Sequence, residues 1–162
     1  MKPSASVVAD ASPLIALARL NLLKLLPKLF NSVFVPQTVL AECTILAAYP
    51  EAVPIRAAIA NGWVALADDP VPPQSWNLDP GETSTIGIAI ERQTGVIMDD
   101  QAGRRTAHHL GIPVIGTAGI LVQAKRKKII KAVRPQLEKL SDSGYYLDQR
   151  LLQTTLHLAG EV

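Results

Sequence analysis

Residues 6–17 read SVVADASPLIAL, and this stretch decides the fold class of the chain. Its first four residues are a short apolar run with two β-branched valines, which is typical of a buried strand, and the run stops at Asp10. The apolar residues that follow recur at near-helical spacing, and Pro13 stands early, where a helix tolerates proline. The stretch therefore predicts a strand, an acidic residue at its end, and then a helix.

The same alternation of strands and helices continues along the chain. Strands are expected at 6–9, 32–35, 63–67, 96–98 and 112–115, and helices at 11–26, 38–48, 51–61, 81–92, 101–110, 117–130, 135–140 and 147–159. Prolines at 70, 72, 73 and 80 predict a loop over 69–80, because proline lacks the N–H that helices and sheets need. This order predicts an α/β fold, with a mainly parallel sheet covered by helices on both faces.

Length and composition favour one domain, 1–162, since 162 residues with 48% hydrophobic content can bury a core. The single cysteine, Cys43, cannot form an internal disulfide, which agrees with a reducing compartment, and we expect a cytoplasmic location. The chain begins without the pattern of a signal peptide, and its longest apolar stretch, 20–30, is interrupted by two lysines and a proline. We therefore expect no membrane association.

Five carboxylates stand where the predicted fold would gather them: Asp10, Glu42, Glu82, Asp99 and Asp100. Asp10 and Asp99 each follow an apolar strand, and the ligand crevice of a parallel sheet lies outside the carboxyl ends of its strands. Glu42 and Glu82 belong to helices that could return to that edge. Carboxylates in one cleft repel each other unless a cation lies among them. Oxygen ligands without a matching set of cysteines or histidines predict Mg²⁺ or Mn²⁺, which can activate water and stabilise a phosphodiester being cut.

Each acid also has a structural interpretation, which the sequence leaves open. Asp10 could cap the helix that follows it, Glu82 could compensate the dipole at a helix start, and Glu42 could be a solvated helix residue. Asp99 and Asp100 are consecutive, and consecutive side chains of a strand point to opposite faces. We favour Asp99 as a direct or water-mediated ligand, and Asp100 as either a second ligand or the N-cap of the next helix.

Basic residues form two groups: Arg104 and Arg105, and then Lys125, Arg126, Lys127 and Lys128. The first group directly follows the acids and could grip an RNA backbone, or one arginine could bridge the carboxylates. The second group stands in the last turns of a predicted helix, where cations complement the helix dipole, and contact with RNA phosphates is the alternative. His108 and His109 have no partner at metal-ligand spacing, so they are interpreted as ordinary helix residues.

Four segments resemble PIN-domain proteins, specifically a prokaryotic branch related to VapC toxins. They read VVADASPLI at 7–15, VPQTVLAE at 35–42, LDPGE at 78–82 and IMDDQAGRR at 97–105, and their order and spacing match over nearly the whole chain. The resemblance implies a PIN-like three-layer α/β/α sandwich. It further implies a magnesium- or manganese-dependent endoribonuclease that cuts RNA as the toxin of a type II toxin–antitoxin pair. A small antitoxin protein as partner and a homodimer are implied as well.

The resemblance also implies site roles. In the family the first aspartate, the helix glutamate and the later acids bind metal, which carries over to Asp10, Glu42, Glu82, and Asp99 or Asp100. Ser12 is implied as a hydrogen-bonding support. Many PIN nucleases have an aspartate in the helix that here offers Glu82, so this sequence departs from the family at that position.

The sequence also bears on functions other than a ribonuclease. The main alternative is a PIN-fold module that binds RNA or protein without cutting it. A nucleotide-binding Rossmann protein is disfavoured because no G-x-G-x-x-G follows the first strand. A phosphatase with Asp10 as nucleophile is disfavoured because the residues after it, Ala11 and Ser12, supply no second acid.

Overall fold

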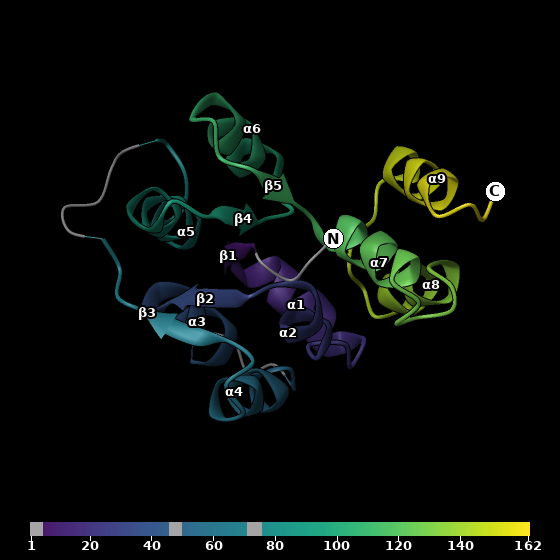
Figure 1. Ribbon diagram of the computed structural model, residues 1–162, viewed down its shortest axis with the longest axis horizontal. Coiled ribbons are helices and arrows are strands. Elements are labelled where there is room, and N and C mark those ends of the chain that lie inside the picture. Colours follow the sequence, from purple (N-terminus) through teal and green to yellow (C-terminus); the bar gives the residue numbers. More distant parts are fainter. Residues whose placement is uncertain (1–4, 46–49, 71–75) are drawn as a thin grey trace.

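The computed structural model describes residues 5–45, 50–70 and 76–162. Its centre is a sheet of five parallel strands in the order β3-β2-β1-β4-β5, drawn in Figure 1. The strands are β1 (Ser6–Ala9), β2 (Ser32–Pro36), β3 (Ala65–Ala67), β4 (Gly95–Ile97) and β5 (Val114–Ile115). The expected α/β fold is confirmed, and every strand pairing is parallel.

Helices cover both faces of the sheet. They are α1 (Ala11–Arg19), α2 (Leu25–Leu29), α3 (Gln37–Thr44), α4 (Ala52–Ala60), α5 (Pro80–Arg92), α6 (Gln101–His109), α7 (Thr117–Arg126), α8 (Arg134–Asp142) and α9 (Gln149–Leu158). Side chains of β1 alternate between two cores: Val7 and Ala9 pack with residues of α1, α2, α4 and α7, whereas Val8 packs with residues of α5 and α6. This two-sided burial confirms the expected three-layer sandwich.

The expected helix over 11–26 is wrong in its extent, because α1 ends at Arg19. Asn21 adopts the left-handed conformation, with φ at 56°, which asparagine tolerates better than most residues. The amides of Asn21 and Leu22 bond back to the carbonyls of Ala18 and Leu17, and these bonds close the helix end. Leu25 and Leu26 belong to the separate short helix α2, whereas Leu22 and Leu23 lie in the connection before it.

Other expected elements are shorter in the structure. The helix expected over 117–130 ends at Arg126, because Lys128 is left-handed, with φ at 62°, and its amide bonds back to the Lys125 carbonyl. The strand expected over 112–115 is reduced to β5. Parts of the helix expected over 38–48 and of the loop expected over 69–80, namely 46–49 and 71–75, lie outside the described residues.

The strand order decides where a site can form. β1 lies between β2 and β4, so the chain winds away from it in both directions, and such a switch point is where open α/β sheets bind ligands. Ala9 pairs with Ile97, and the Asp10 amide donates to the Ile97 carbonyl at 3.0 Å. The acids that follow β1 and β4 are therefore neighbours at the carboxyl edge of the sheet.

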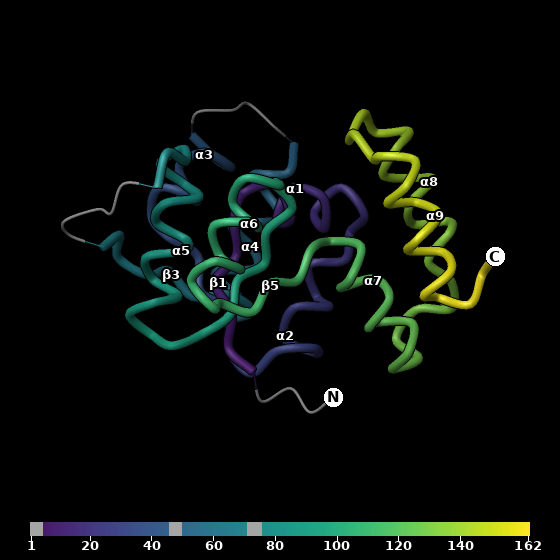
Figure 2. The backbone as a smooth tube through the Cα atoms, turned by 90° about the horizontal axis from the view of Figure 1, so that it is seen from above, coloured from purple at the N-terminus to yellow at the C-terminus, as the bar shows by residue number. Residues whose placement is uncertain are grey.

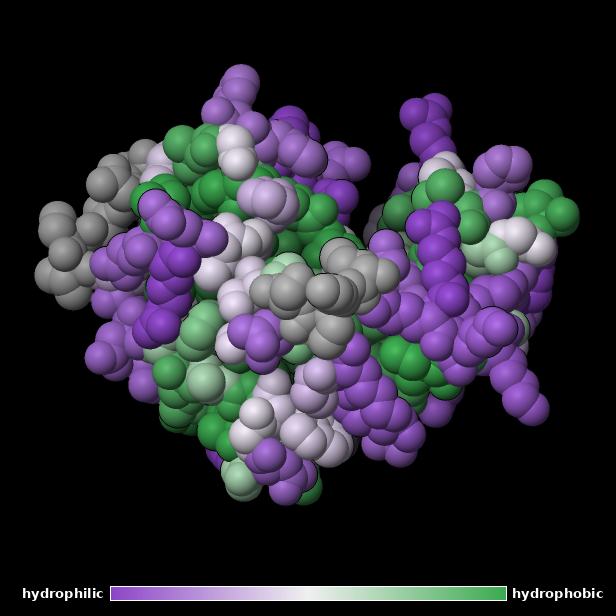
Figure 3. All heavy atoms as spheres, viewed as in Figure 1, coloured by the Kyte–Doolittle hydropathy of each residue, from purple (hydrophilic) through white to green (hydrophobic). Residues whose placement is uncertain are grey.

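The C-terminal helices extend beyond the β5 edge of the sheet. Figures 1 and 2 show α7 leading from the sheet to α8 and α9, at the end of the molecule that holds the C-terminus. In the view of Figure 3, hydrophilic residues predominate over this part, with single hydrophobic ones among them. Leu151 and Leu158 of α9 are exposed. Within the described ranges, no helix combines the length and apolar character that crossing a membrane requires.

Candidate functional site

Asp10 is the buried centre of the acidic group. It occupies the N-cap position of α1, but its side chain makes no capping hydrogen bond, so the simple capping interpretation does not describe it. Only 5% of the residue is exposed. Burial raises the pKa of Asp10 to about 8, and repulsion from Glu82, Asp79 and Glu42 adds to this, against a backbone hydrogen bond from Ala11. Asp10 therefore lies buried among like charges, and burial more than repulsion disfavours its ionised form.

Glu82 belongs to the first turn of α5, where it forms a reciprocal cap with Asp79. Asp79 Oδ1 accepts from the Glu82 amide at 2.8 Å, and Glu82 Oε1 accepts from the Asp79 amide at 3.3 Å. Glu82 thus stands at the helix start, as expected, and the reciprocal cap with Asp79 is an additional structural role. The residue is also 8% exposed, and burial, followed by repulsion from Asp79 and contact with Asp100, raises its pKa to about 7. The Glu82 side chain therefore caps α5 and also lies close to other carboxylates of the acidic group.

Glu42 reaches the same place from α3 and is half-buried. Its carboxylate lies against the start of α5, where a Cβ added to Gly81 would overlap Glu42 Oε1. Burial and repulsion from Asp79 raise the pKa of Glu42, while a hydrogen bond from the Gly81 backbone opposes the rise. The missing side chain at Gly81 thus lets a carboxylate approach the positive end of a helix.

Asp99 is surrounded by hydrogen-bond donors. Its Oδ1 accepts from the Thr117 amide at 2.8 Å, and its Oδ2 accepts from Thr117 Oγ1 at 2.6 Å and from the Tyr145 hydroxyl at 2.5 Å. Both acceptor positions of Oδ2 are therefore used within the protein. Burial, then the charge of Asp99, raises the pKa of Tyr145, and the Asp10 charge contributes to the rise, so the hydroxyl lies within range of both acids.

Asp100 caps α6, as one of the two sequence interpretations expected. Its Oδ2 accepts from the Gly103 amide at 3.0 Å. It also contacts Glu82, which belongs to the acidic group around Asp10. Which of the two consecutive aspartates binds metal stays a prediction, and the donors that surround Asp99 shift our preference to Asp100.

The two roles of Asp100 can be separated by substitution. Asp100→Ala removes both cap and charge, so we expect a loss of about 0.5–2 kcal/mol in unfolding free energy together with loss of RNA cleavage. Asp100→Asn should keep the stability, because asparagine caps helices as well as aspartate does, and still lose cleavage. Urea denaturation and cleavage rates measure the two effects. Full activity in a folded Asp100→Asn variant would return the ligand role to Asp99.

The supporting residues expected from the sequence take different places. Ser12 is exposed in the first turn of α1 and makes no hydrogen bond to the described residues. Arg104 Nη1 donates to the Met98 carbonyl at 2.9 Å and lies beside Gly116, whereas Arg105 is exposed on α6. Within the described ranges neither arginine forms an ion pair with an acid, so the expected bridge between carboxylates is not formed. His108 and His109 are exposed at the end of α6.

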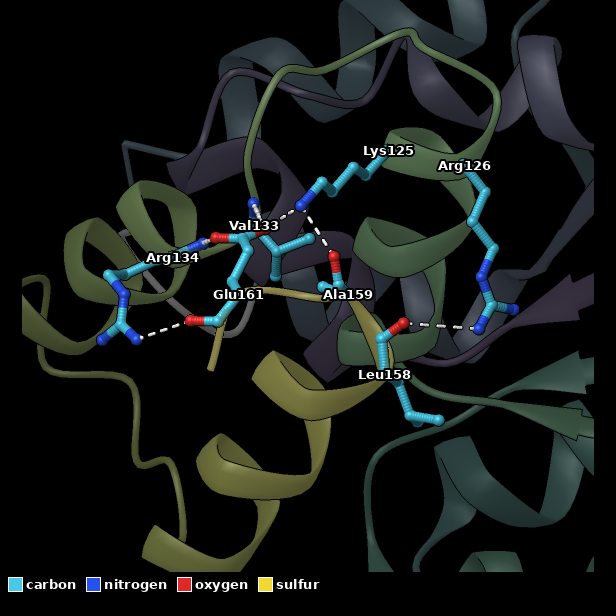
Figure 4. A network of polar contacts seen from close by, with 7 residues as sticks. All are labelled: Lys125, Arg126, Val133, Arg134, Leu158, Ala159 and Glu161. Atoms are coloured by element: carbon cyan, nitrogen blue, oxygen red, sulfur yellow. Dashed lines mark hydrogen bonds and ion pairs between the residues drawn. The ribbon is translucent and has the colours of Figure 1, made fainter.

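The second basic group is partly engaged with the C-terminus. Lys125 Nζ donates to the Ala159 carbonyl at 2.7 Å and pairs with Glu161 at 2.9 Å, and Arg126 Nη2 contacts the Leu158 carbonyl at 3.5 Å (Figure 4). Lys125 lies in the last turn of α7, as the dipole interpretation expected, and these contacts also bring it to the carbonyls that end α9. The structural interpretation therefore describes Lys125. Lys127 is half-buried and Lys128 is exposed.

The acids gather without forming a finished metal site. In the part of the chain that the structure describes, no three His, Cys, Asp or Glu side chains converge as ligands of one ion. The ion pairs found there join Arg19 to Glu51 and Lys125 to Glu161, so no lysine or arginine neutralises the acidic group. An all-oxygen, mutually repelling donor set is chemically suited to a hard divalent cation.

Three residues of this edge were missed as site residues: Asp79, Thr117 and Tyr145. Asp79 could have been found from the pattern Asp-Pro-x-Glu, which is typical of a capped helix start. Thr117 follows a strand at the sheet edge that holds the acids. Tyr145 had no local signal, because its partner Asp99 is 46 residues away in the sequence.

Comparison with known proteins places the chain in a family. The family model described as DUF3368: PIN domain matches residues 6–161. Among solved structures, the chain is similar to the PilT N-terminus domain protein SSO1118 from the hyperthermophilic archaeon Sulfolobus solfataricus P2. That similarity has 20% sequence identity and a TM-score of 0.55, covers 74% of this chain and 92% of that one, and bears on the fold. No curated protein matches the sequence. Since the family model spans nearly all of the sequence, this chain belongs to the PIN-domain family.

Proposed function

We propose that this chain is a metal-dependent endoribonuclease, which hydrolyses RNA phosphodiester bonds with Mg²⁺ or Mn²⁺. The observation that carries the proposal is Asp10, buried at the switch point of the sheet among other carboxylates. Ionised carboxylates that are buried together are costly unless a positive charge compensates them. The described residues supply no such charge, and membership in the PIN-domain family supports a nuclease.

The proposal assigns roles to the residues of this edge. Asp10, Glu82 and Asp100 would hold the cation, and Glu42 would join them from the start of α5. A bound divalent cation supplies an activated water and stabilises the charge on the phosphate that is cut. Asp79 orients Glu82 through the reciprocal cap, because each residue accepts a hydrogen bond from the other's amide.

The decisive experiment is cleavage of a mixture of structured RNAs by the purified chain. We expect products with Mn²⁺ or Mg²⁺, and none with EDTA. Products that form equally in EDTA, or no products with either metal, would contradict the proposal. An Asp10→Asn sample purified in parallel shows whether a contaminating nuclease contributes.

The second candidate function is a PIN-fold module that binds RNA or protein without cutting. One observation favours it: the carboxylates in the described part of the chain do not converge as a set of metal ligands. Such a module would retain RNA in a binding assay and release intact RNA after incubation with Mn²⁺. The same two measurements, binding and cleavage, therefore separate the two candidates.

We also propose that the nuclease is the toxin of a type II toxin–antitoxin pair, with a small antitoxin protein as partner, and that it forms a homodimer. The resemblance to VapC-related proteins supports these roles. Expression in a bacterial host tests the toxin role: growth arrest by the wild type, relieved by Asp10→Asn, is the expected result, and normal growth contradicts it. Light scattering on the purified chain tests the homodimer, and a monomer mass contradicts it.

Lys127 and Lys128, just after α7, are expected to affect RNA binding, whereas Lys125, in its last turn, is expected to affect stability. Changing Lys127 and Lys128 to glutamine should weaken RNA binding and flatten its salt dependence by up to about two units of slope, if both contact phosphates. Lys125→Gln should instead lower the melting temperature, because Lys125 holds the end of α9. Binding is measured at several salt concentrations. An unchanged slope in the Lys127 and Lys128 variant would remove these residues from the RNA surface.

A further inference from the structure

Tyr145 brings the C-terminal part of the chain to the acidic edge of the sheet. The residue lies in the turn between α8 and α9, and its ring packs against the core that contains β1 and α1. Its hydroxyl donates to Asp99 Oδ2 at 2.5 Å, on the same oxygen that accepts from Thr117 Oγ1. The ring and the hydroxyl thus have separate partners, so the hydroxyl can be removed while the ring stays packed.

Contacts along the α8–α9 pair hold this turn in place. The Tyr145 amide bonds to the Leu140 carbonyl at 3.3 Å, and Arg19 Nη1 donates to the Ser143 carbonyl at 3.3 Å. The far end of α9 is held by Lys125, which binds Ala159 and Glu161 (Figure 4). These contacts fix the α8–α9 turn and the end of α9 against the rest of the fold, and Tyr145 lies in the turn that is fixed in this way.

The Tyr145 hydroxyl donates a hydrogen bond to Asp99. Asp100 is the next residue in the chain and caps α6, so the position of Asp99 helps to fix the position of Asp100. Hydrogen bonds from Thr117 and Tyr145 hold the carboxylate of Asp99 in one orientation. They also tie the end of β4 to the start of α7 and to the α8–α9 turn. Without the tyrosine donor, Thr117 alone holds the Asp99 carboxylate, which is then less firmly fixed beside the other acids.

We infer that Tyr145 is a positioning residue of the proposed nuclease site. Its hydroxyl holds Asp99, and through Asp99 the neighbouring Asp100, in the arrangement that binds the cation. The inference rests on the proposed function. It makes the α8–α9 turn part of the active edge, although the turn follows the last strand of the sheet.

Tyr145→Phe tests the inference, with Tyr146→Phe as the matched control, since Tyr146 is 83% exposed. The first variant should bind Mn²⁺ about 10–100-fold more weakly in calorimetry and lose cleavage rate by a similar factor, the range typical of hydrogen-bonding groups that support a metal site from outside its ligands. Its melting temperature without metal should stay close to that of the control. The control should match the wild type in metal affinity and rate.

A double substitution shows whether the tyrosine acts through Asp99. On an Asp99→Ala background, Tyr145→Phe should change Mn²⁺ affinity no further, because the hydroxyl has lost the group that it holds. An equal loss on both backgrounds would overturn the positioning role.

The outcomes separate this inference from the proposed function. A wild type that cuts RNA, beside a Tyr145→Phe variant with the same Mn²⁺ affinity and rate, overturns the inference and leaves the nuclease standing. A wild type that binds Mn²⁺ without cutting overturns the nuclease, and the Mn²⁺ affinity of Tyr145→Phe then decides the inference. A wild type that binds no Mn²⁺ overturns both.

Discussion

Replacing Asp10 with asparagine is expected to abolish RNA cleavage and to leave the fold intact. The amide keeps the shape of the carboxylate but carries no charge, so it removes the buried ligand at the centre of the acidic group. A ligated cation contributes several kcal/mol to stabilising the transition state, so the rate should fall by about 10³-fold or more.

Initial rates with Mn²⁺ on one RNA measure the effect, and circular dichroism checks the fold. Asp142→Asn is the matched control, because Asp142 is exposed in α8 and the same amide change there should leave the rate unaltered. A folded Asp10→Asn variant that cuts at the wild-type rate would remove Asp10 from the catalytic group.

Without metal, the wild type is expected to lose stability as the pH rises from about 4 to 8. The Asp10 pKa is about 8 in the folded chain and 3.8 in the reference state, so unfolding releases a proton between these values and the unfolding free energy falls there. Four pKa units correspond to on the order of 5 kcal/mol. Glu82, with its pKa raised to about 7, changes stability in the same direction.

The Asp10→Asn variant should lack most of this loss, because asparagine does not ionise. At pH 8 in EDTA it should melt higher than the wild type, by on the order of 10 °C, while at pH 5 the difference should be small. Thermal melts at both pH values measure this, and Asp142→Asn should follow the wild type. Parallel pH curves for the wild type and Asp10→Asn would show that Asp10 ionises without cost.

Adding Mn²⁺ at pH 8 extends the same comparison. A cation bound only by the folded chain raises the melting temperature more when it binds more tightly, so the wild type should gain more than Asp10→Asn. Equal gains would mean that the carboxylate does not share in holding the cation.

Local patterns in the sequence were enough to find the sheet and its acidic edge. The apolar run that ends at Asp10 and the run that ends at Asp99 are strands in the structure, and β1 and β4 pair directly. Because parallel strands present their carboxyl ends at one edge, the expectation of a parallel sheet was enough to place these acids at that edge, without knowledge of the strand order. The cap at Asp100 was likewise indicated by local residue types, whereas α5 begins at Pro80, one residue before the expected start.

Helix lengths could not be obtained in this way. Leu20 to Leu26 continue an apolar pattern that suits a helix, yet Asn21 turns the backbone and those leucines enter the core from a loop and from α2. Burial of their side chains outweighs the small preference for a continued helix. Periodicity reports which residues are buried, and it does not report whether one helix or two bury them.

The hydrogen-bond partners of Asp99, Tyr145 among them, were decided only by the tertiary structure. The sequence by itself determined that acids follow β1 and β4, since this depends on short apolar runs and their neighbours. It did not determine that Thr117 and Tyr145 occupy the oxygens of Asp99, because these donors arrive from α7 and from the α8–α9 turn. Hydrogen bonds between distant segments depend on how the helices pack, and no local preference of either segment encodes that distance.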